Sequence, residues 1–412
     1  MRRRLDTGVF SLLVLMQIEK MFMKAVLVGV GETAVGKSDS IAVNSLLKKA
    51  LESALADAGL KKSELDGLIV CPALADSKFM AAHNLSSELE ICGNLKFCST
   101  LDTGGASPVS ALILAKRLIE LGALETIAVV AGDAVLSLGT SEFLNRAGRS
   151  INHPAYQDFT QPTIPLLYNL VAEWHMKTYG TKREQLAMVP VLMSRQSAKH
   201  PGAINRKELT LEDILNSKKI ASVTNLLECA RLADGAGAVI VTSEKRAGDL
   251  KQKPIFVIGG GEGVGPAHLP AQISQEIFSA KRAATIALAE AGMSKIHNID
   301  YFGIYDCFPI CFIKFLEDSG LAMEGHGGYW VECMHNFTSP NSGFNHKLQV
   351  NTHGGLLSFG APWEAPAMFG IIEAVRQVRN QAGERQLAKA STALVYGNGG
   401  IFTSSAVAIL SR

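Results

Sequence analysis

Residues 95–119 read LKFCSTLDTGGASPVSALILAKRLI, and this stretch decides the fold class. The apolar run at 95–101 predicts a strand. A glycine-containing turn at 102–108 then leads into residues 109–119, which are apolar on most sides of a helix. A helix that is apolar all round is a buried one. A strand, a turn and a buried helix in this order predict an α/β protein.

The same alternation continues on both sides of this unit. Within the first half, strands are predicted at 24–30, 65–70, 126–131 and 235–242, and a helix over 41–55 that Ser40 caps and Gly59 ends. Within the second half, strands are predicted at 255–259 and 301–304, helices at 276–291 and 366–379, and a last pair of strands around 396–400. Both halves repeat one order of elements, which indicates an internal duplication.

We therefore expect two halves of similar size, residues 23–252 and 253–412. The polar stretch 136–234 is predicted to be a loop domain inserted into the first half. A chain of 412 residues, of which 47% are hydrophobic, is long enough to bury a large core.

Residues 1–22 have a different character. Arg2, Arg3 and Arg4 precede an apolar run, a pattern typical of a mitochondrial targeting leader. Two alternatives remain open at this point: a secretory signal, or a cytosolic protein whose true start is Met21 or Met23.

Composition argues against several other classes of protein. The net charge is only +2, and we find no basic cluster with interleaved aromatics, so a nucleic-acid partner is not expected. The seven cysteines are scattered and form no C-x-x-C pair, which predicts neither a disulfide framework nor a metal site. The apolar run at 9–16 is too short for a transmembrane segment, which needs about 20 residues.

Residues 31–38 (GETAVGKS) fit the phosphate-loop pattern G-x-x-x-x-G-K-S. A phosphate loop requires a helix that starts at its Lys-Ser pair, so that free N–H groups face the phosphates. Asp39 would place a negative charge at that helix start. The hypothesis of a nucleotide site is therefore disfavoured.

Two segments and four loops resemble the thiolases. Residues 175–181 (HMKTYGT) are similar to the H-M-x-x-Y-G-T segment of the family, and residues 234–238 (DGAGA) to its D-G-A-A-A entry to a strand. From Met23 onward the chain resembles the sterol-carrier-protein type of the thiolase superfamily. This implies the thiolase fold, in which duplicated βαβαβαββ halves form a five-layer αβαβα arrangement with an inserted loop domain.

The four catalytic loops of such thiolases are altered here. The resemblance places the nucleophile of the C-x-S loop at Gly105, so the thiolytic cysteine is missing. Histidine is replaced by Tyr305 in the H-D-C-F loop and by Ala361 in the G-H-P loop, and Gly397 opens the glycine-rich variant of the fourth loop. Gly105, Ala361 and Gly397 are thus degenerate catalytic positions.

Cys98 offers an alternative nucleophile, because Cys98-Ser99-Thr100 reads like a thiolase C-S-T loop. It lies on the strand side of the turn, seven residues before the expected place, and seven extended residues span about 23 Å. We expect Cys98 to be a buried, inert thiol.

Thiolysis needs a thiolate, which Gly105 cannot provide. The resemblance implies that an oxyanion hole survives, formed by the backbone N–H groups of Gly105 and Gly399. Such a site suits enolate chemistry on a short acyl-coenzyme A. The candidate acid, base and supporting residues are Cys307, Tyr305, Asp306 and His353.

Three functions remain open from the sequence. Decarboxylation of a malonyl-type thioester is ranked first, because the leaving carbon dioxide needs no base. Retro-aldol cleavage of a β-hydroxyacyl thioester is the alternative, with Tyr305 as the base. The third is a binding or regulatory protein that holds an acyl-coenzyme A without turnover.

The resemblance also implies the partners. No cofactor is expected; a coenzyme A thioester is the substrate or ligand, with contacts from Arg195, Lys199, His175 and Met176. Thiolases pair through the strand that precedes the nucleophile loop, so a homodimer through 95–101 is expected.

Overall fold

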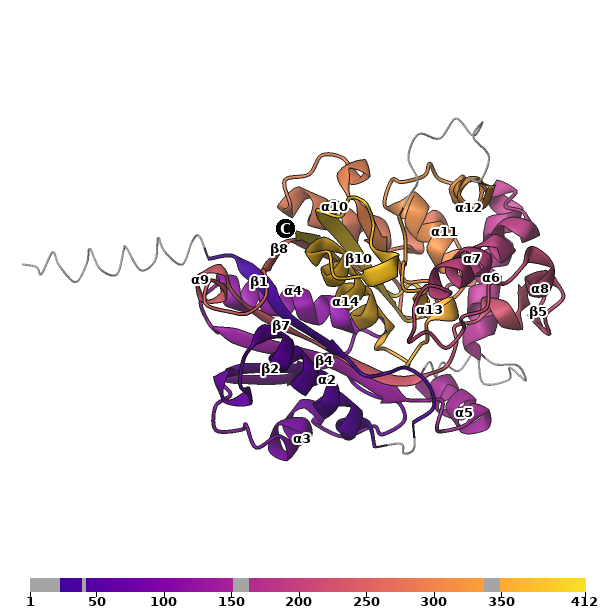
Figure 1. Ribbon diagram of the computed structural model, residues 1–412. Coiled ribbons are helices and arrows are strands. Elements are labelled where there is room, and N and C mark those ends of the chain that lie inside the picture. Colours follow the sequence, from indigo (N-terminus) through magenta and orange to yellow (C-terminus); the bar gives the residue numbers. More distant parts are fainter. Residues whose placement is uncertain (1–22, 39–41, 151–162, 337–348) are drawn as a thin grey trace, which may run out of the picture.

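The computed structural model describes residues 23–38, 42–150, 163–336 and 349–412 (Figure 1). The leader predicted for residues 1–22 and the capping Ser40 lie outside these ranges. Among the described helices, none is both long enough and apolar enough to cross a membrane.

A mixed sheet forms the centre of the molecule. In the described part of the chain it has nine strands, in the order β3-β2-β4-β7-β1-β8-β11-β10-β9. The strands are β1 (Ala25–Glu32), β2 (Gly67–Val70), β3 (Phe97–Thr100), β4 (Thr126–Ala134), β7 (Asp234–Ser243), β8 (Ile255–Val264), β9 (Tyr301–Gly303), β10 (Thr392–Gly399) and β11 (Ser404–Ser411).

The two halves of this sheet repeat the same pairing. β2 runs parallel to β4 as β9 does to β10, and β4 is antiparallel to β7 as β10 is to β11. The first half-sheet is β3-β2-β4-β7-β1 and the second is β8-β11-β10-β9. β1 is the last strand of the first and β8 the first strand of the second, and the two pair with each other through Val26–Phe256 and Leu27–Ile255. In the second half the partner equivalent to β3 is reduced to a parallel bridge between Phe302 and Val350. The predicted duplication is confirmed, while the boundaries proposed for the halves stay predictions.

Helices fill the space between the half-sheets and cover their outer faces. α4 (Ser107–Glu120) and α14 (Pro366–Arg379) pack between the half-sheets and contact strands of both. α2 (Val43–Ala58) and α3 (Ala81–Glu88) cover the first half-sheet, and α10 (Ala280–Glu290) and α11 (Pro309–Asp318) cover the second. The layers therefore follow the expected αβαβα order (Figure 1).

A group of helices lies beside these layers. The stretch between β4 and β7 supplies α5 (Thr140–Ser150), α6 (Thr163–Tyr179), α7 (Arg183–Ser197), α8 (Leu211–Leu215) and the hairpin of β5 (Lys219–Ala221) and β6 (Thr224–Asn225). α12 (Gly327–Asn336) and α13 (Gly355–Ser358), from the second half, pack against α7. The short α9 (Glu244–Ala247) follows β7.

Most predicted elements are confirmed to within a few residues, and α14 has the predicted bounds. Two predictions were wrong in detail. The helix expected from 276 begins at Ala280, because Gln275–Ile277 forms a separate 3-10 turn. Residues 396–399 lie within β10 rather than between two strands, because their glycines allow the strand to pack closely against the turn before α4.

The segment that fits the phosphate-loop pattern does not open a helix. α2 begins at Val43. The amides of Gly36 and Ser38 instead donate to the backbone oxygen and a carboxylate oxygen of Asp234, at 3.1 and 2.8 Å. N–H groups that a phosphate would need are therefore already used.

Candidate active site

Two glycine-containing segments meet at the N-terminus of α4. A Cβ on Gly399 would lie 1.8 Å from the carbonyl oxygen of Thr103, and a Cβ on Gly397 would lie 2.8 Å from the Cα of Ala106. Neither distance is compatible with a side chain, so the end of β10 packs against the turn before α4 with backbone on backbone. The structure thus brings Gly105 and Gly399 to one place, while the oxyanion hole itself stays a prediction.

Tyr305 fills the space beside Gly105. A Cβ on Gly105 would lie 2.1 Å from the Oη of Tyr305 and 2.5 Å from the carbonyl oxygen of Asn398. Tyr305 is 6% exposed, and burial raises the pKa of its hydroxyl well above the usual value. A protonated phenol from another loop therefore occupies the space that a side chain at position 105 would need.

Two cysteines, Cys307 and Cys311, lie close enough to this phenol to influence its pKa. The sulfur atoms of Cys307 and Cys311 are 3.4 Å apart, and both residues are buried. Burial raises the pKa of Cys311 well above the usual value, and the neighbouring Cys307 raises it further. At least the Cys311 member of the pair is therefore a neutral thiol.

Tyr168 of α6 is a site residue that the sequence reasoning missed. Its hydroxyl donates to the carbonyl oxygen of Gly400 at 2.6 Å and accepts from the side-chain amide of Asn398 at 3.0 Å. Its ring stacks on Phe308 with centroids 4.6 Å apart. Nothing in the sequence around Tyr168 distinguishes it from an ordinary apolar helix position.

Glu364 was missed as well. The hydroxyl of Ser107 donates to its Oε2 at 3.0 Å, and the same hydroxyl oxygen accepts from the amide of Thr103 at 2.8 Å. Burial and the charge of Asp102 raise the pKa of the Glu364 carboxyl to about 8. Glu364 follows two residues after Pro362 of the loop that resembles G-H-P (residues 360–362, the third loop), and this place in the sequence was the signal that could have found it.

Asp306 has a structural role. Its side chain is fully buried, and its Oδ1 accepts from the amide of Leu356 at 2.8 Å, at the start of α13. A Cβ on Gly355, which has φ +61°, would lie 2.3 Å from the carboxylate. Burial raises the pKa of Asp306 to about 7. Asp306 thus holds α13 against the loop that carries Tyr305.

His353 lies in a different environment from Tyr305. Burial lowers its pKa to about 4, and the charged groups that act on it are Glu373, Arg385 and Arg376. Its ring packs edge-on against Phe359, at 5.3 Å. His353 is therefore a neutral side chain, and the charged groups that act on it differ from Glu364 and Asp306, the carboxylates that act on Tyr305.

Ala361 is held by its backbone. Its amide donates to the carbonyl oxygen of Arg231 at 2.7 Å, and its carbonyl oxygen accepts from Ala233 at 3.4 Å. These two bonds attach the third loop, which Glu364 follows in the sequence, to the segment that enters β7.

Comparison with known proteins shows what the chain is similar to. Residues 261–412 match the model of the thiolase C-terminal domain-like family. The chain is 27% identical to acetyl-CoA acetyltransferase of Methanothermobacter thermautotrophicus, over 93% of this chain and 98% of the relative. It is also 27% identical to human sterol carrier protein 2, over 90% of this chain and 69% of that protein.

The chain is similar to thiolase-like proteins of the sterol-carrier-protein type. Other similar proteins are aldolases. The steroid side-chain-cleaving aldolase of Thermomonospora curvata is 29% identical, over 87% of this chain and 92% of the relative. The solved Ltp2-ChsH2(DUF35) aldolase is 26% identical and superposes with a TM-score of 0.79, over 94% of this chain and 98% of the other.

A second solved structure shares the fold of this chain. It is a monomeric SCP2-thiolase like protein type 1 from Mycobacterium smegmatis, which is 20% identical, with a TM-score of 0.68 over 94% of this chain and 77% of the other.

Of the residues expected to bind coenzyme A, His175 and Met176 lie in α6, Arg195 lies in α7, and Lys199 follows α7. His175 is fully buried, and its ring nitrogens lie 2.8 Å from Thr181 and 3.1 Å from Glu317, which leaves neither nitrogen for a ligand. Met176 is half-buried, and Lys199 is exposed. Arg195 donates to the backbone oxygen of His335 at 3.3 Å. Coenzyme A contacts by Arg195, Lys199 and Met176 stay predictions.

Cys98 lies in β3 opposite Leu68, not in the turn before α4. It is half-buried rather than buried as expected, because β3 is an edge strand. Burial still raises its pKa.

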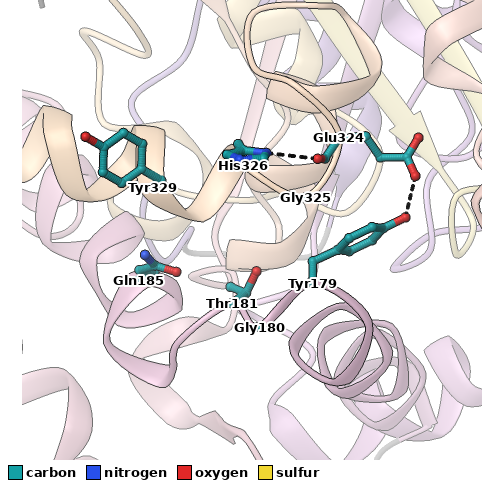
Figure 2. A pocket seen from close by; sticks show the side chains of 8 residues that line it. All are labelled: Tyr179, Gly180, Thr181, Gln185, Glu324, Gly325, His326 and Tyr329. Atoms are coloured by element: carbon teal, nitrogen blue, oxygen red, sulfur yellow. Dashed lines mark hydrogen bonds between the residues drawn. The ribbon is translucent and has the colours of Figure 1, made fainter.

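A polar pocket of about 240 Å³ lies between the end of α6 and the start of α12 (Figure 2). Two hydrogen bonds lie at its wall: the hydroxyl of Tyr179 donates to Glu324 at 2.6 Å, and the Nδ1 of His326 lies 3.1 Å from the backbone oxygen of Glu324 in the same loop. None of the predicted catalytic residues lines this pocket.

Proposed function

We propose that this protein cleaves a β-hydroxyacyl-coenzyme A by a retro-aldol reaction. The products are a carbonyl compound and a shorter acyl-coenzyme A. The observation that carries the proposal is the position of the Tyr305 hydroxyl, which occupies the space that a side chain on Gly105 would need. A phenol in this position replaces covalent catalysis by hydrogen bonding to the substrate.

The reaction uses the groups that meet at α4. The β-hydroxyl loses its proton to a base, its carbon becomes a carbonyl carbon, and the bond between Cα and Cβ breaks. The electron pair of that bond enters the thioester as an enolate, and Cα then takes a proton, for which Cys307 is our candidate donor. Backbone N–H groups at Gly105 and Gly399 would hold the enolate oxygen, and such a donor contributes about 3 to 4 kcal/mol.

Charge around the site favours this reaction over decarboxylation, which the sequence had ranked first. The electrostatic contributions to the raised pKa of Glu364 come from the carboxylates Asp102 and Asp133. A malonyl-type substrate would bring one more carboxylate into this acidic region, and like charges there oppose binding. A β-hydroxyacyl thioester is neutral at the reacting end. The similarity to two aldolases supports the same choice.

Turnover assays with the purified protein test the proposal. We expect a coenzyme A thioester with a tertiary β-hydroxyl to be cleaved to a ketone and acyl-coenzyme A, detected by mass spectrometry. Malonyl- and acetoacetyl-coenzyme A should stay intact. Because one aldolase structure includes a second protein, ChsH2(DUF35), the assay is run with and without that protein.

Tyr305→Phe is the sharpest variant, because it removes only the hydroxyl. We expect kcat to fall by about 100-fold or more, the usual contribution of a positioned proton-transfer or hydrogen-bonding group. Tyr301→Phe, at a buried tyrosine of β9, is the matched control and should leave kcat unchanged. Loss of carbon dioxide from malonyl-coenzyme A would overturn the proposal, and binding of all thioesters without turnover would favour a regulatory protein.

A further inference from the structure

A retro-aldol reaction needs a base for the β-hydroxyl, and the structure argues against the residue that the sequence indicated. Burial, with the two nearby cysteines as the next contribution, raises the pKa of Tyr305 well above its usual value. A phenol of this kind donates hydrogen bonds readily. It can accept a proton only after it has lost its own, and with a raised pKa it does not lose that proton near neutral pH. The base must therefore be another group.

Glu364 has the position that such a base requires. Its Oε2 is held by the hydroxyl of Ser107, two residues after Gly105 and at the first turn of α4. The oxygen of Ser107 also accepts from the amide of Thr103, which holds the hydroxyl in place. The hydroxyl donates to Glu364, and it orients the carboxyl at the edge of the Gly105 site.

The backbone of the third loop helps to set this orientation. Trp363, directly before Glu364, has φ +46°, a left-handed conformation that is uncommon outside glycine. Its ring packs edge-on against Phe143, with centroids 5.8 Å apart. Pro366 then starts α14. Glu364 is thus held on a short turn between a packed tryptophan and a helix, and it remains half-buried rather than sealed from ligands.

We propose that Glu364 is the general base of this site and takes the proton of the substrate's β-hydroxyl, an inference that rests on the proposed retro-aldol function. The proton moves from the hydroxyl oxygen to a carboxylate oxygen of Glu364 as the bond between Cα and Cβ breaks. The enolate takes one proton at Cα from Cys307, which regains a proton from solvent, and Glu364 releases its proton to solvent. Protons and electrons balance over the cycle, and no oxidant or further reactant is needed.

The groups around Glu364 determine how its activity should depend on pH. Asp102, in the turn before α4, and Asp133, in β4, are the charges that raise its pKa together with burial, to about 8. Glu364 in turn raises the pKa of Cys71, after β2, and of Tyr305. The carboxyl is therefore mostly protonated at pH 7, and its basic form increases as the pH rises through about 8.

The pH profile of cleavage by the purified full chain tests the assignment. For the wild-type protein we expect kcat/KM to rise with pH and to level off above about 8. Glu364→Gln keeps an oxygen that can accept from Ser107 but cannot take a proton. It should lower kcat by about 100-fold or more and remove this rise, while Glu364→Asp should keep part of the activity and the pH dependence.

Two further variants separate a catalytic role from a structural one. Ser107→Ala removes a hydrogen bond to the charged form of Glu364, so the rise in kcat/KM should move to higher pH. Glu262→Gln is the matched control, because Glu262 accepts from Ser110 on the same helix. It should leave the profile unchanged. Melting temperatures of all variants are measured to identify any that fail to fold.

The possible outcomes distinguish this inference from the proposed function. If the wild-type protein cleaves the substrate and folded Glu364→Gln keeps the wild-type rate and pH profile, Glu364 is not the base although the retro-aldol function stands. If the wild-type protein cleaves no β-hydroxyacyl thioester, with or without the added ChsH2(DUF35) protein, the function is wrong and the inference falls with it.

Discussion

At the scale of single residues, the position of the Tyr305 hydroxyl depends on residue 105 being a glycine. Gly105 leaves a space that the hydroxyl of Tyr305 fills, and the two residues lie 200 positions apart in the sequence. Gly397 and Gly399 are needed for a different reason, because the backbone of the turn before α4 packs directly on them. Gly105 and the phenol of Tyr305 are therefore parts of one arrangement.

Gly105→Ala should show this dependence directly. The added methyl group would lie 2.1 Å from the Oη of Tyr305, so the phenol has to move. We expect cleavage to fall by about 100-fold or more, and the free energy of unfolding to decrease by about 1 to 3 kcal/mol through overpacking. Enzyme assays and urea denaturation measure the two effects.

Gly93→Ala is the control for this substitution, since a Cβ on Gly93 meets no atom within 4 Å. Gly105→Cys should likewise give no thiolysis, because Tyr305 occupies the space of the thiol and the third loop has Ala361. Full aldol activity in Gly105→Ala would show that Tyr305 need not be where the structure has it.

At the scale of elements, a buried network of charges joins two helices of the site. α6 carries Tyr168, and α11 carries Cys311. Between them, Lys314 lies 3.3 Å from Glu317 and 3.2 Å from Asp318, and Glu317 in turn contacts His175 of α6. All of these side chains are at most 1% exposed. His175, from the motif that resembles the thiolase H-M-x-x-Y-G-T segment, therefore holds α6 against α11.

Lys314→Met tests the importance of this network. It removes the lysine charge and leaves Glu317 and Asp318 buried, a change that costs about 3 to 5 kcal/mol in comparable buried pairs. We expect a loss of that size in the free energy of unfolding, measured with urea. Lys177→Met, at an exposed lysine of α6, should change it by less than about 0.5 kcal/mol. Equal stabilities of the two variants would contradict the role of the network.

At the scale of the whole molecule, β3 lies at one edge of the sheet. In the described part of the chain it pairs with β2 alone, so its other side presents unpaired backbone groups. An exposed edge of this kind is a template for a second chain. The homodimer that we proposed from the resemblance would use this edge, although one structure with the same fold is described as monomeric.

Sedimentation of the purified chain decides the oligomeric state. We expect a dimer at micromolar concentration, and we expect Ser99→Lys in β3 to shift it to a monomer, because a charge on an edge strand opposes pairing. Thr285→Lys, on the exposed side of α10, should leave the dimer intact. A wild-type chain that sediments as a monomer at every concentration would rule out the dimer.

Much of the fold was predictable because its signals are local. The apolar faces of α4 and α14, the glycine that ends α2 and the runs that form the strands follow from periodicity over a few residues. The repeated order of elements indicated the duplication of the sheet. The glycine-rich loops and Tyr305 were also recognisable from their motifs.

The sequence by itself thus determined the order of the elements and the glycine-containing loops, while the loss of a cysteine nucleophile at position 105 stays a prediction from the resemblance. Only the tertiary structure decided which side chains meet at the site. Tyr168 meets Asn398 across 230 positions, and Ser107 meets Glu364 across 257, distances at which no local pattern operates. The raised pKa values of Tyr305 and Glu364 come from burial and from neighbouring groups, which exist only once the chain has folded.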